Sequence, residues 1–205
     1  MDEDLHQPIL QSQEEEKTPI KLILCGDYGS GKTSMLERHI YRTFCEDEPS
    51  KMTKRKVKLN IKVRNEKETL LISDTNGEEK YQSLQMNHFV NAHCAIIVFD
   101  VSNESSFESV EYWFKIIKLY EPDIPILVAG NKSDKRIEVS YERALNICEQ
   151  YGSELIYCSA KTGKKVNKVF RRIVHLYFNV KDECEIQMEE TKEEPVENSH
   201  CLCCC

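Results

Sequence analysis

The stretch KLILCGDYGSGKTSMLERHI at residues 21–40 combines an apolar run, a glycine-rich loop and the beginning of a helix. The run at 21–25 predicts a buried strand, and the segment from Ser34 onward predicts a helix. Between them, residues 26–33 match the pattern G-x-x-x-x-G-K-[ST]. The glycines allow successive backbone N–H groups to turn inward around an anion, and the helix N-terminus adds its positive dipole end. This stretch therefore predicts a phosphate-binding loop between a strand and a helix.

Lys32 and Thr33 give this loop its expected chemistry. Lys32 can reach the β and γ phosphates of a nucleotide and is also a candidate catalytic residue. The Thr33 hydroxyl can bind Mg²⁺, which prefers oxygen ligands. The alternative is a glycine-rich strand–helix connection without a ligand. We expect the rest of the loop to contact the nucleotide as well: Gly26, Asp27, Tyr28, Gly29, Ser30, Gly31 and Ser34.

A second motif, DTNG at residues 74–77, follows the apolar run at 70–72. A carboxylate at the end of a strand, as expected for Asp74, can hold a Mg²⁺-bound water. Gly77 lets its backbone N–H approach a γ-phosphate closely, because no Cβ intervenes. Alone, these residues would be typical of an ordinary turn. The phosphate loop upstream favours the metal-site interpretation.

The motif NKSD at residues 131–134 follows the apolar run at 124–129. The Asp134 carboxylate can accept two N–H bonds from the N1 and N2 side of guanine. Adenine would leave this carboxylate buried without a donor, which is costly. Asn131 can join neighbouring loops, and the aliphatic part of Lys132 can lie along the ring face. In isolation the motif could be an ordinary polar loop.

The motif SAK at residues 159–161 follows another apolar run, at 155–158. Because Ala160 is small, its backbone N–H could approach the guanine O6 atom, with Ser159 and Lys161 beside it. Each of the four motifs could occur by chance. Their fixed order, with each one after a strand-like run, predicts guanine-nucleotide binding.

Strand-like and helix-like segments alternate along the chain, which predicts an α/β fold with a largely parallel sheet and helices on both faces. Residues 57–63 and 69–73, with a turn at 65–68, predict a hairpin that adds one antiparallel pair. A final amphipathic helix is expected from about residue 165 to residue 178. All four motifs then lie at the C-terminal ends of strands, where open α/β sheets bind ligands.

With these motifs the chain resembles the small Ras-like GTPases, and among them the Rab branch, over about residues 20–178. The resemblance implies a P-loop NTPase G domain whose six-stranded, mostly parallel sheet contains one antiparallel strand. It also implies binding of GTP and GDP with Mg²⁺, GTP hydrolysis, and edge-on stacking of Phe44 against the guanine. Further matching segments are DTNGEEKY at 74–81, IIVFDVS at 96–102, Ser106 and Phe107 with Trp113, and CSAK at 158–161.

Charge divides the 205-residue chain into one compact domain and two acidic ends. Residues 1–17 carry six acidic residues and one Lys, and residues 182–205 carry eight and one, so the segment between them is +5 within a total of −7. Acidic, polar segments with few aromatic residues are typical of disorder. We therefore expect a disordered extension at 1–18, a small-GTPase domain at 19–180 and an acidic tail at 181–205.

Four of the ten cysteines lie within the last five residues. A zinc site is a weak alternative there, because three adjacent cysteines cannot easily share one tetrahedral ion. Leu202 occupies the position where the C-a-a-X pattern requires Cys. The final pair resembles the double prenylation site of Rabs, and two lipid chains give stable anchoring. We expect lipids on Cys204 and Cys205, with Cys203 as the competing site.

Three positions depart from the pattern of the Ras-like family. Glu78 follows the DxxG glycine, where the family usually has a Gln that orients the attacking water. Tyr28 occupies a slot that is usually small and could crowd the place of an activating arginine. Ungapped spacing puts Lys51 in the slot of the Mg²⁺-binding Thr, with Thr53 as the nearest Thr and Ser50 as an alternative. Glu78 is therefore the second candidate catalytic residue, and we expect slow hydrolysis.

The segment leading into and along the strand at 57–63 is unusually basic. The plain interpretation is a solvated strand face, because the inward positions alternate as apolar residues. No aromatic residues interleave with the basic ones, which argues against a nucleic-acid partner. An acidic effector or an anionic membrane surface fits this charge better. The basic residues are Lys51, Lys54, Arg55, Lys56, Lys58, Lys62 and Arg64.

Three functions remain as hypotheses. The first is a prenylated Rab-like GTPase in vesicle traffic, on the cytosolic face of an intracellular membrane and with a soluble cytosolic pool. Its partners would be effector, exchange-factor and GTPase-activating proteins and the prenylation machinery. The second is a GTP-binding scaffold with little hydrolysis, which Tyr28, Glu78 and the missing Thr in the Mg²⁺-binding slot favour. The third is a Ras-like signalling GTPase outside vesicle traffic.

Overall fold

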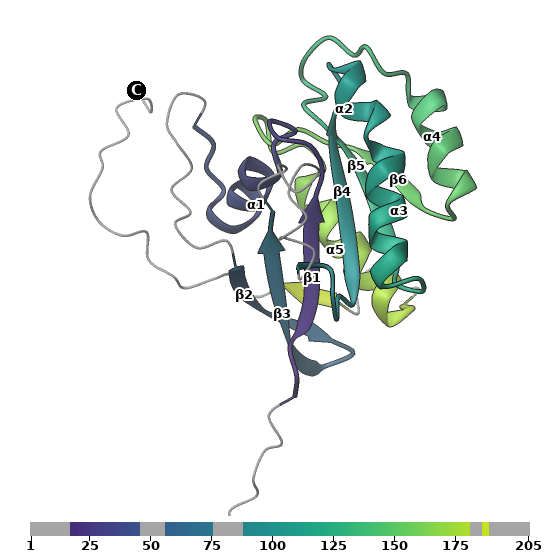
Figure 1. Ribbon diagram of the computed structural model, residues 1–205. Coiled ribbons are helices and arrows are strands. Elements are labelled where there is room, and N and C mark those ends of the chain that lie inside the picture. The colour runs from purple at the N-terminus through teal and green to yellow at the C-terminus, as the bar shows by residue number, and fades with distance from the viewer. Residues whose placement is uncertain (1–16, 46–55, 76–87, 181–185, 189–205) are drawn as a thin grey trace, which may run out of the picture.

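The computed structural model describes residues 17–45, 56–75, 88–180 and 186–188. These residues form one seven-stranded sheet with helices on both faces (Figure 1). The strands are β1 (Ile20–Cys25), β2 (Lys56–Val63), β3 (Glu66–Asp74), β4 (Cys94–Asp100), β5 (Ile126–Asn131), β6 (Glu154–Tyr157) and β7 (Ile186–Met188). The helices are α1 (Lys32–Tyr41), α2 (Glu104–Glu108), α3 (Val110–Tyr120), α4 (Tyr141–Gln150) and α5 (Val166–Phe178).

The sheet has the strand order β6-β5-β4-β1-β3-β2-β7. The pairs β1–β3, β1–β4, β4–β5 and β5–β6 are parallel, whereas β2 runs antiparallel to both neighbours. Every residue of β4 and β5 is buried, as expected for parallel strands covered on both faces. The predicted α/β fold with one antiparallel strand is confirmed, although the sheet has one strand more than the six expected.

Two hydrophobic cores lie on opposite faces of this sheet. One core contains α1 and α5, with Met35, Leu36 and Phe170 against the inward side chains of β1 to β3. The other contains α2, α3 and α4, with Trp113 and Phe114 among its large buried side chains. Figure 1 shows α2, α3 and α4 together on one side of the strands. The two cores fix the positions of the loops that leave the C-terminal ends of the strands.

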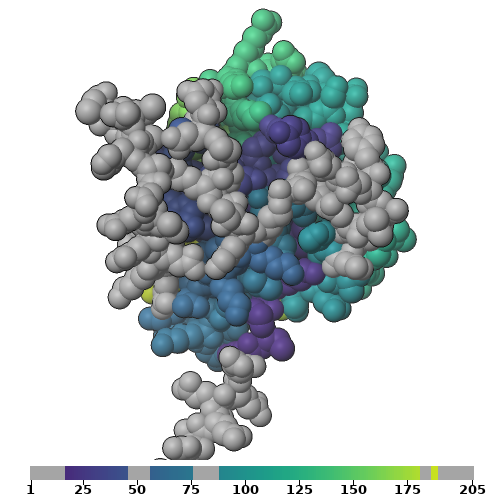
Figure 2. Space-filling view, turned by 60° about the vertical axis from the view of Figure 1, so that its left-hand side comes forward, coloured from purple at the N-terminus to yellow at the C-terminus, as the bar shows by residue number. Residues whose placement is uncertain are grey.

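The β2–β3 hairpin turns more tightly than the sequence predicts. Arg64 and Asn65 have φ angles of 50° and 67°, and β3 already begins at Glu66. Positive φ at both central residues is the geometry of a type I′ turn, which matches the twist of the two strands. Along β2, buried and exposed residues alternate as predicted. In Figure 2 the hairpin (blue) and the α2–α4 region (teal to green) lie on opposite sides of the same face.

The additional strand β7 lies in the segment that was expected to be a disordered tail. Ile186 pairs with Val63 and Met188 with Ile61 at the outer edge of β2. The Ile186 side chain is fully buried, and its carbonyl accepts a hydrogen bond from the Arg171 guanidinium at 3.2 Å. The expectation of disorder is therefore wrong for residues 186–188. Among the described residues, no helix is both long and apolar enough to span a membrane.

Candidate functional site

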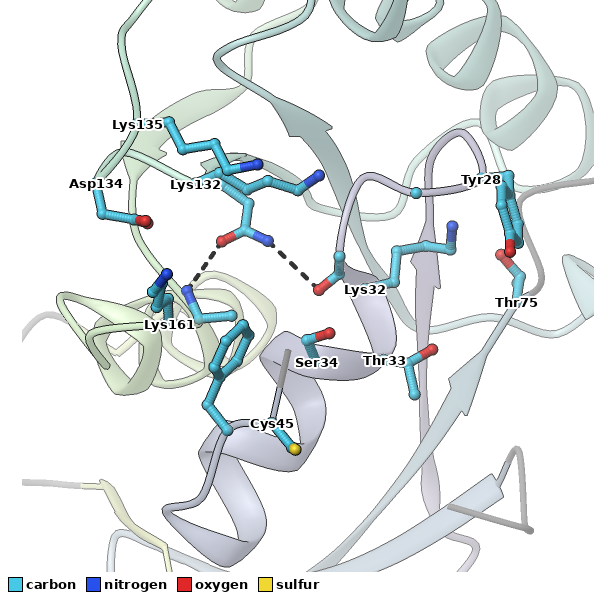
Figure 3. Close-up of a pocket in the computed structure, with 15 residues that line it drawn as sticks. Tyr28, Lys32, Thr33, Ser34, Cys45, Thr75, Lys132, Asp134, Lys135 and Lys161 are labelled. Carbon is cyan, nitrogen blue, oxygen red and sulfur yellow. Dashed lines mark hydrogen bonds between the residues drawn. The ribbon is translucent and has the colours of Figure 1, made fainter. Parts of the chain in front are cut away.

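A cavity of about 480 Å³ lies at the C-terminal edge of the sheet (Figure 3). Its walls come from the phosphate loop and α1, from the residues after α1, and from the loops that follow β3, β5 and β6. The sequence motifs are thus brought together although their residues are up to 135 positions apart in the chain. The lining residues are Tyr28, Gly29, Gly31, Lys32, Thr33, Ser34, Phe44, Cys45, Thr75, Asn131, Lys132, Asp134, Lys135, Ala160 and Lys161.

The phosphate loop has a backbone that requires glycine at two positions. Gly26 has φ +136°, and a Cβ there would lie 2.0 Å from the Val98 carbonyl oxygen. Gly31 has φ +90°, and its Cβ would lie 2.3 Å from the Asn131 amide nitrogen. Both positions combine a left-handed φ with close approach of a neighbour, which only glycine accommodates. The loop is therefore packed tightly against β4 and the end of β5.

Lys32, the first residue of α1, is almost completely buried. Its Nζ atom donates hydrogen bonds to the Gly26 carbonyl at 2.8 Å and to the Asp27 carbonyl at 3.0 Å. A lysine is rarely buried without such partners. The two carbonyls hold a positive charge at the loop that leads into the N-terminus of α1. This arrangement is suited to an anionic ligand.

Thr33 and Asp74, both predicted to hold Mg²⁺, are in direct contact. The Thr33 Oγ1 atom donates to the Asp74 Oδ2 atom at 2.6 Å, which joins α1 to the end of β3. Ser30 and Thr75 each have a buried hydroxyl without a hydrogen-bond partner among the described residues. Buried hydroxyls are normally paired, so Thr75, which lines the cavity, favours a polar ligand there. The oxygen donors therefore fit Mg²⁺ and phosphate.

Asn131 links the phosphate end to the opposite end of the cavity. Its amide nitrogen donates to the Ser30 carbonyl at 3.0 Å and to the Gly31 carbonyl at 3.4 Å. Its amide oxygen accepts from the Ala160 N–H at 3.0 Å, and Figure 3 shows the bonds to Gly31 and Ala160. The Ala160 N–H, which we expected to face the guanine O6 atom, thus has a protein partner. A bond from this N–H to a guanine would have to be shared with Asn131.

Asp134 lines the cavity and is oriented from the loop after β6. The Ser159 hydroxyl donates to the Asp134 Oδ1 atom at 2.5 Å and itself accepts from the Thr162 N–H at 3.1 Å. Ser159 therefore supports Asp134 and is not among the residues that line the cavity. The Asp134 carboxylate, which the sequence analysis assigned to guanine recognition, is therefore held by Ser159 of the motif SAK.

Lys132 forms an ion pair that the sequence did not reveal. Its Nζ atom lies 2.7 Å from the Asp100 Oδ2 atom at the end of β4. Burial raises the pKa of the Asp100 carboxyl, but the bonds from Lys132 and Ser102 outweigh burial and hold this pKa below its ordinary value. The ion pair fixes the end of the side chain of Lys132, which lines the cavity.

Phe44 lines the cavity, and Arg38 lies behind it. The Arg38 guanidinium is 6.0 Å from the centre of the Phe44 ring and donates to the carbonyls of Ala160 at 2.8 Å and Lys161 at 2.6 Å. Sequence reasoning missed Arg38, and no motif marks it. Thr75 and Lys135 were also missed, although each directly follows a motif residue that was singled out.

Several residues predicted from the sequence lie outside the described residues. They are Gly77 and Glu78 of the second motif, Thr53 with its alternatives Ser50 and Lys51, and the cysteines Cys203, Cys204 and Cys205.

Comparison with known proteins identifies the family. The Ras family model matches residues 21–179. The Ras-related protein Rab-5B of Plasmodium falciparum (isolate 3D7) is 31% identical over 171 residues, which cover 82% of this chain and 83% of that protein. The Ypt/Rab-type GTPase ypt71 of Schizosaccharomyces pombe is 32% identical, with 77% and 80% covered, and the Ras-related protein RabC of Dictyostelium discoideum is 33% identical, with 78% and 84% covered. The chain therefore belongs to the Ras family, as a divergent Rab-like GTPase.

Proposed function

We propose that the cavity binds GTP and GDP together with Mg²⁺, and that the protein alternates between these two nucleotide states. The observation that carries this proposal is the position of Asn131, whose side chain joins the phosphate loop to the loop that contains Ala160. Asp134 lines the same cavity beside this link and supplies the acceptor pair that guanine requires. Adenine offers no matching donors and would leave the carboxylate unpaired.

Each residue at the phosphate end has a proposed role. Lys32 neutralises phosphate charge, and the backbone of the loop orients the phosphates at the N-terminus of α1. Thr33 and Asp74 hold Mg²⁺, directly or through a water, and the bound ion contributes further neutralisation of phosphate charge. Thr53 is the proposed additional ligand. Nucleotide contacts are also assigned to Gly77, through its N–H, and to the residues of both base-side motifs.

Hydrolysis is proposed to be slow. Glu78 occupies the place of the water-orienting Gln, and its carboxylate would add negative charge beside an anionic phosphate. Tyr28 is 79% exposed at the rim of the phosphate loop, where an activating arginine would have to enter. These two residues favour, as a second candidate function, a GTP-binding scaffold with little turnover.

The cellular role is proposed from the Rab-named relatives and the cysteines at the end of the sequence. The protein acts in vesicle traffic on the cytosolic face of an intracellular membrane and exchanges with a soluble pool. Lipids on Cys204 and Cys205, or on Cys203 as the alternative, supply the anchor after recognition by the prenylation machinery. Effector, exchange-factor and GTPase-activating proteins are the proposed protein partners, and nucleic acid is not among them.

Equilibrium binding of a fluorescent GDP analogue, with Mg²⁺ and with EDTA, tests the nucleotide proposal. The wild-type protein should bind the analogue and release it faster when EDTA removes Mg²⁺. Thr33→Asn should bias the protein away from the Mg²⁺·GTP state and should respond less to EDTA. Binding that neither EDTA nor Thr33→Asn alters would contradict the assignment of the metal site.

Membrane fractionation tests the anchor separately. Replacing Cys203, Cys204 and Cys205 together by Ser should move the protein to the soluble fraction while nucleotide binding persists. The acidic tail should be repelled by anionic lipid headgroups, so lipid must supply nearly all of the attachment. A triple variant that remains in the membrane fraction would place the anchor elsewhere.

A further inference from the structure

Asp27 lies in the phosphate loop, and its carboxylate accepts hydrogen bonds from the neighbouring helical layer. The Asp27 Oδ2 atom accepts a hydrogen bond from the Ser109 hydroxyl at 2.5 Å, and Oδ1 accepts one from the Trp113 indole N–H at 2.9 Å. Ser109 lies between α2 and α3, and Trp113 lies on α3. Each carboxylate oxygen therefore has its own donor on the helical layer next to the loop.

Both donors lie on buried residues. Trp113 is 1% exposed and Ser109 is 4% exposed. A buried indole N–H can only donate and needs an acceptor. Bonds from neutral donors to a carboxylate are stronger than bonds between neutral groups. The same bonds direct the negative charge of Asp27 towards α3.

The backbone of Asp27 contacts the group that faces the phosphates. Its carbonyl oxygen accepts from the Lys32 Nζ atom at 3.0 Å and from the Ser30 N–H at 3.2 Å. A displacement of Asp27 would therefore displace the lysine and the turn of the loop together. The side chain of Asp27 is tied to α3, and its main chain is tied to the phosphate-binding machinery.

We propose that Asp27, Ser109 and Trp113 form a link that holds the phosphate loop in its nucleotide-binding conformation, with Asp27 as a positioning residue. This inference rests on the proposed binding of guanine nucleotides at the loop. Through the link, a change in the position of α3 alters the rate at which nucleotide leaves. Trp113 is the single tryptophan of the chain, so its fluorescence reports on the state of the loop.

Mutation of Asp27 should have opposite effects on nucleotide release if the residue acts through its charge and if it acts as a link. If Asp27 acted mainly through its charge, removing the charge would strengthen binding of the anionic phosphates and slow their release. If Asp27 acts as a link, removing it frees the loop and accelerates release. The sign of the change in the GDP dissociation rate therefore separates the two explanations.

The experiment compares full-length variants loaded with radiolabelled GDP in the presence of Mg²⁺. Asp27→Ala should release GDP about tenfold faster than the wild type, the factor expected for the loss of a hydrogen bond to a charged group. Asp27→Asn keeps one acceptor for Trp113 and should lie between the two. The tryptophan emission of the wild type should change when EDTA removes the nucleotide, and Asp27→Ala should lose this change.

Ser153→Ala is the matched control. It removes a buried hydrogen bond, from the Ser153 hydroxyl to the Ile126 carbonyl at 2.7 Å, near the starts of β5 and β6. This variant should lose stability and still release GDP at the wild-type rate. Equal acceleration in Ser153→Ala, or release from Asp27→Ala and Asp27→Asn that is unchanged or slower, would overturn the link.

The two proposals fail in different ways. If the wild type does not bind GDP, the proposed function is wrong, and the link has no ligand to act on. If the wild type retains GDP and Lys32→Ala weakens this binding, the proposed function stands. In that case the Asp27 variants alone decide whether the link exists.

Discussion

The two ends of the cavity, called the guanine end and the phosphate end after the proposed function, are built in different ways. At the guanine end, Asp134 is held by Ser159, and Arg38 donates to two carbonyls of the same loop. At the phosphate end, Lys32 and the Thr33–Asp74 pair have the arrangement expected of a phosphate and metal site. That end, however, also carries Tyr28, an exposed aromatic residue.

This difference separates recognition from catalysis. At the end proposed to bind guanine, Asp134, Lys132 and Phe44 line the cavity, and side chains from other elements brace this end. The phosphate end combines residues suited to binding with Tyr28, which the Ras-like pattern does not contain. Guanine-nucleotide binding should therefore be strong and specific, whereas the rate of hydrolysis should be low and should respond to single substitutions.

The largest effect is expected from Lys32→Ala. The substitution should weaken binding of GDP and GTP by about 100-fold, because it removes a buried charge that is proposed to contact the phosphates. Titration with a fluorescent GDP analogue measures the change. Lys135→Ala removes a cation from the guanine end of the same cavity and is the control. Equal losses in both variants would mean that general positive charge, and not the loop, binds the phosphates.

Acid should destabilise the contact between α1 and α5 that supports the guanine end. His39 is buried, stacks on Phe170 and lies 2.9 Å from the Asn167 side-chain oxygen. Burial lowers the pKa of His39 from 6.5 to about 4, the bond to Asn167 opposes this shift, and Arg42 adds to it.

Because the unfolded chain gains a proton on His39 before the folded chain does, stability is full above about pH 6.5 and falls as the pH decreases towards 4. Between pH 6.5 and 5 the free energy of unfolding should decrease by about 2 kcal/mol from this residue. Urea unfolding across this range measures the decrease. His39→Gln should flatten the dependence on pH, and parallel curves for the two proteins would contradict the assignment.

Arg38→Lys tests the bracing of the guanine end. Lysine keeps the charge but cannot donate in the planar geometry of the guanidinium. GDP release should accelerate by about tenfold, through the loss of bonds to the Ala160 and Lys161 carbonyls. Arg171→Lys, which affects a bond to the Ile186 carbonyl, is the control and should release GDP at the wild-type rate. Unchanged GDP release from Arg38→Lys would show that the Arg38 bonds do not support nucleotide binding.

The smallest effects are expected at Tyr28 and Glu78, two of the three positions that depart from the family pattern. Tyr28→Ser and Glu78→Gln should each raise the single-turnover rate of GTP hydrolysis by a few-fold, with little change in affinity. Faster turnover in either variant would show that the phosphate end limits catalysis. No change in either variant would remove the reason for proposing a low-turnover scaffold.

The sequence predicted the parts of the fold that repeat a strong local pattern. The strands before each motif are short apolar runs, and their order places all four motifs at one edge of the sheet. Strand β7 was missed because its three residues, Ile186 to Met188, have no periodicity of their own. This strand forms because β2 offers a free edge and a buried site for Ile186, and such tertiary context overrides local propensity.

The candidate site follows the same rule. Residues within a motif could be assigned from the sequence, because their spacing carries the chemistry. Arg38 and Asp100 could not be assigned from the sequence, because each contacts a residue that is distant in the chain and belongs to another part of the fold. The bonds from Asp27 to Ser109 and Trp113 join residues 82 and 86 positions apart. No local pattern of residues contains that information.

Competition binding with the wild type and Asp134→Asn tests guanine recognition most directly. Each protein is loaded with a fluorescent GDP analogue and titrated with GTP, ATP and XTP. For the wild type, GTP should displace the analogue and ATP should not, because adenine lacks the donor pair that Asp134 accepts. Asp134→Asn should shift the preference from GTP towards XTP. Displacement of the analogue from the wild type by ATP as effectively as by GTP would contradict guanine recognition at this cavity.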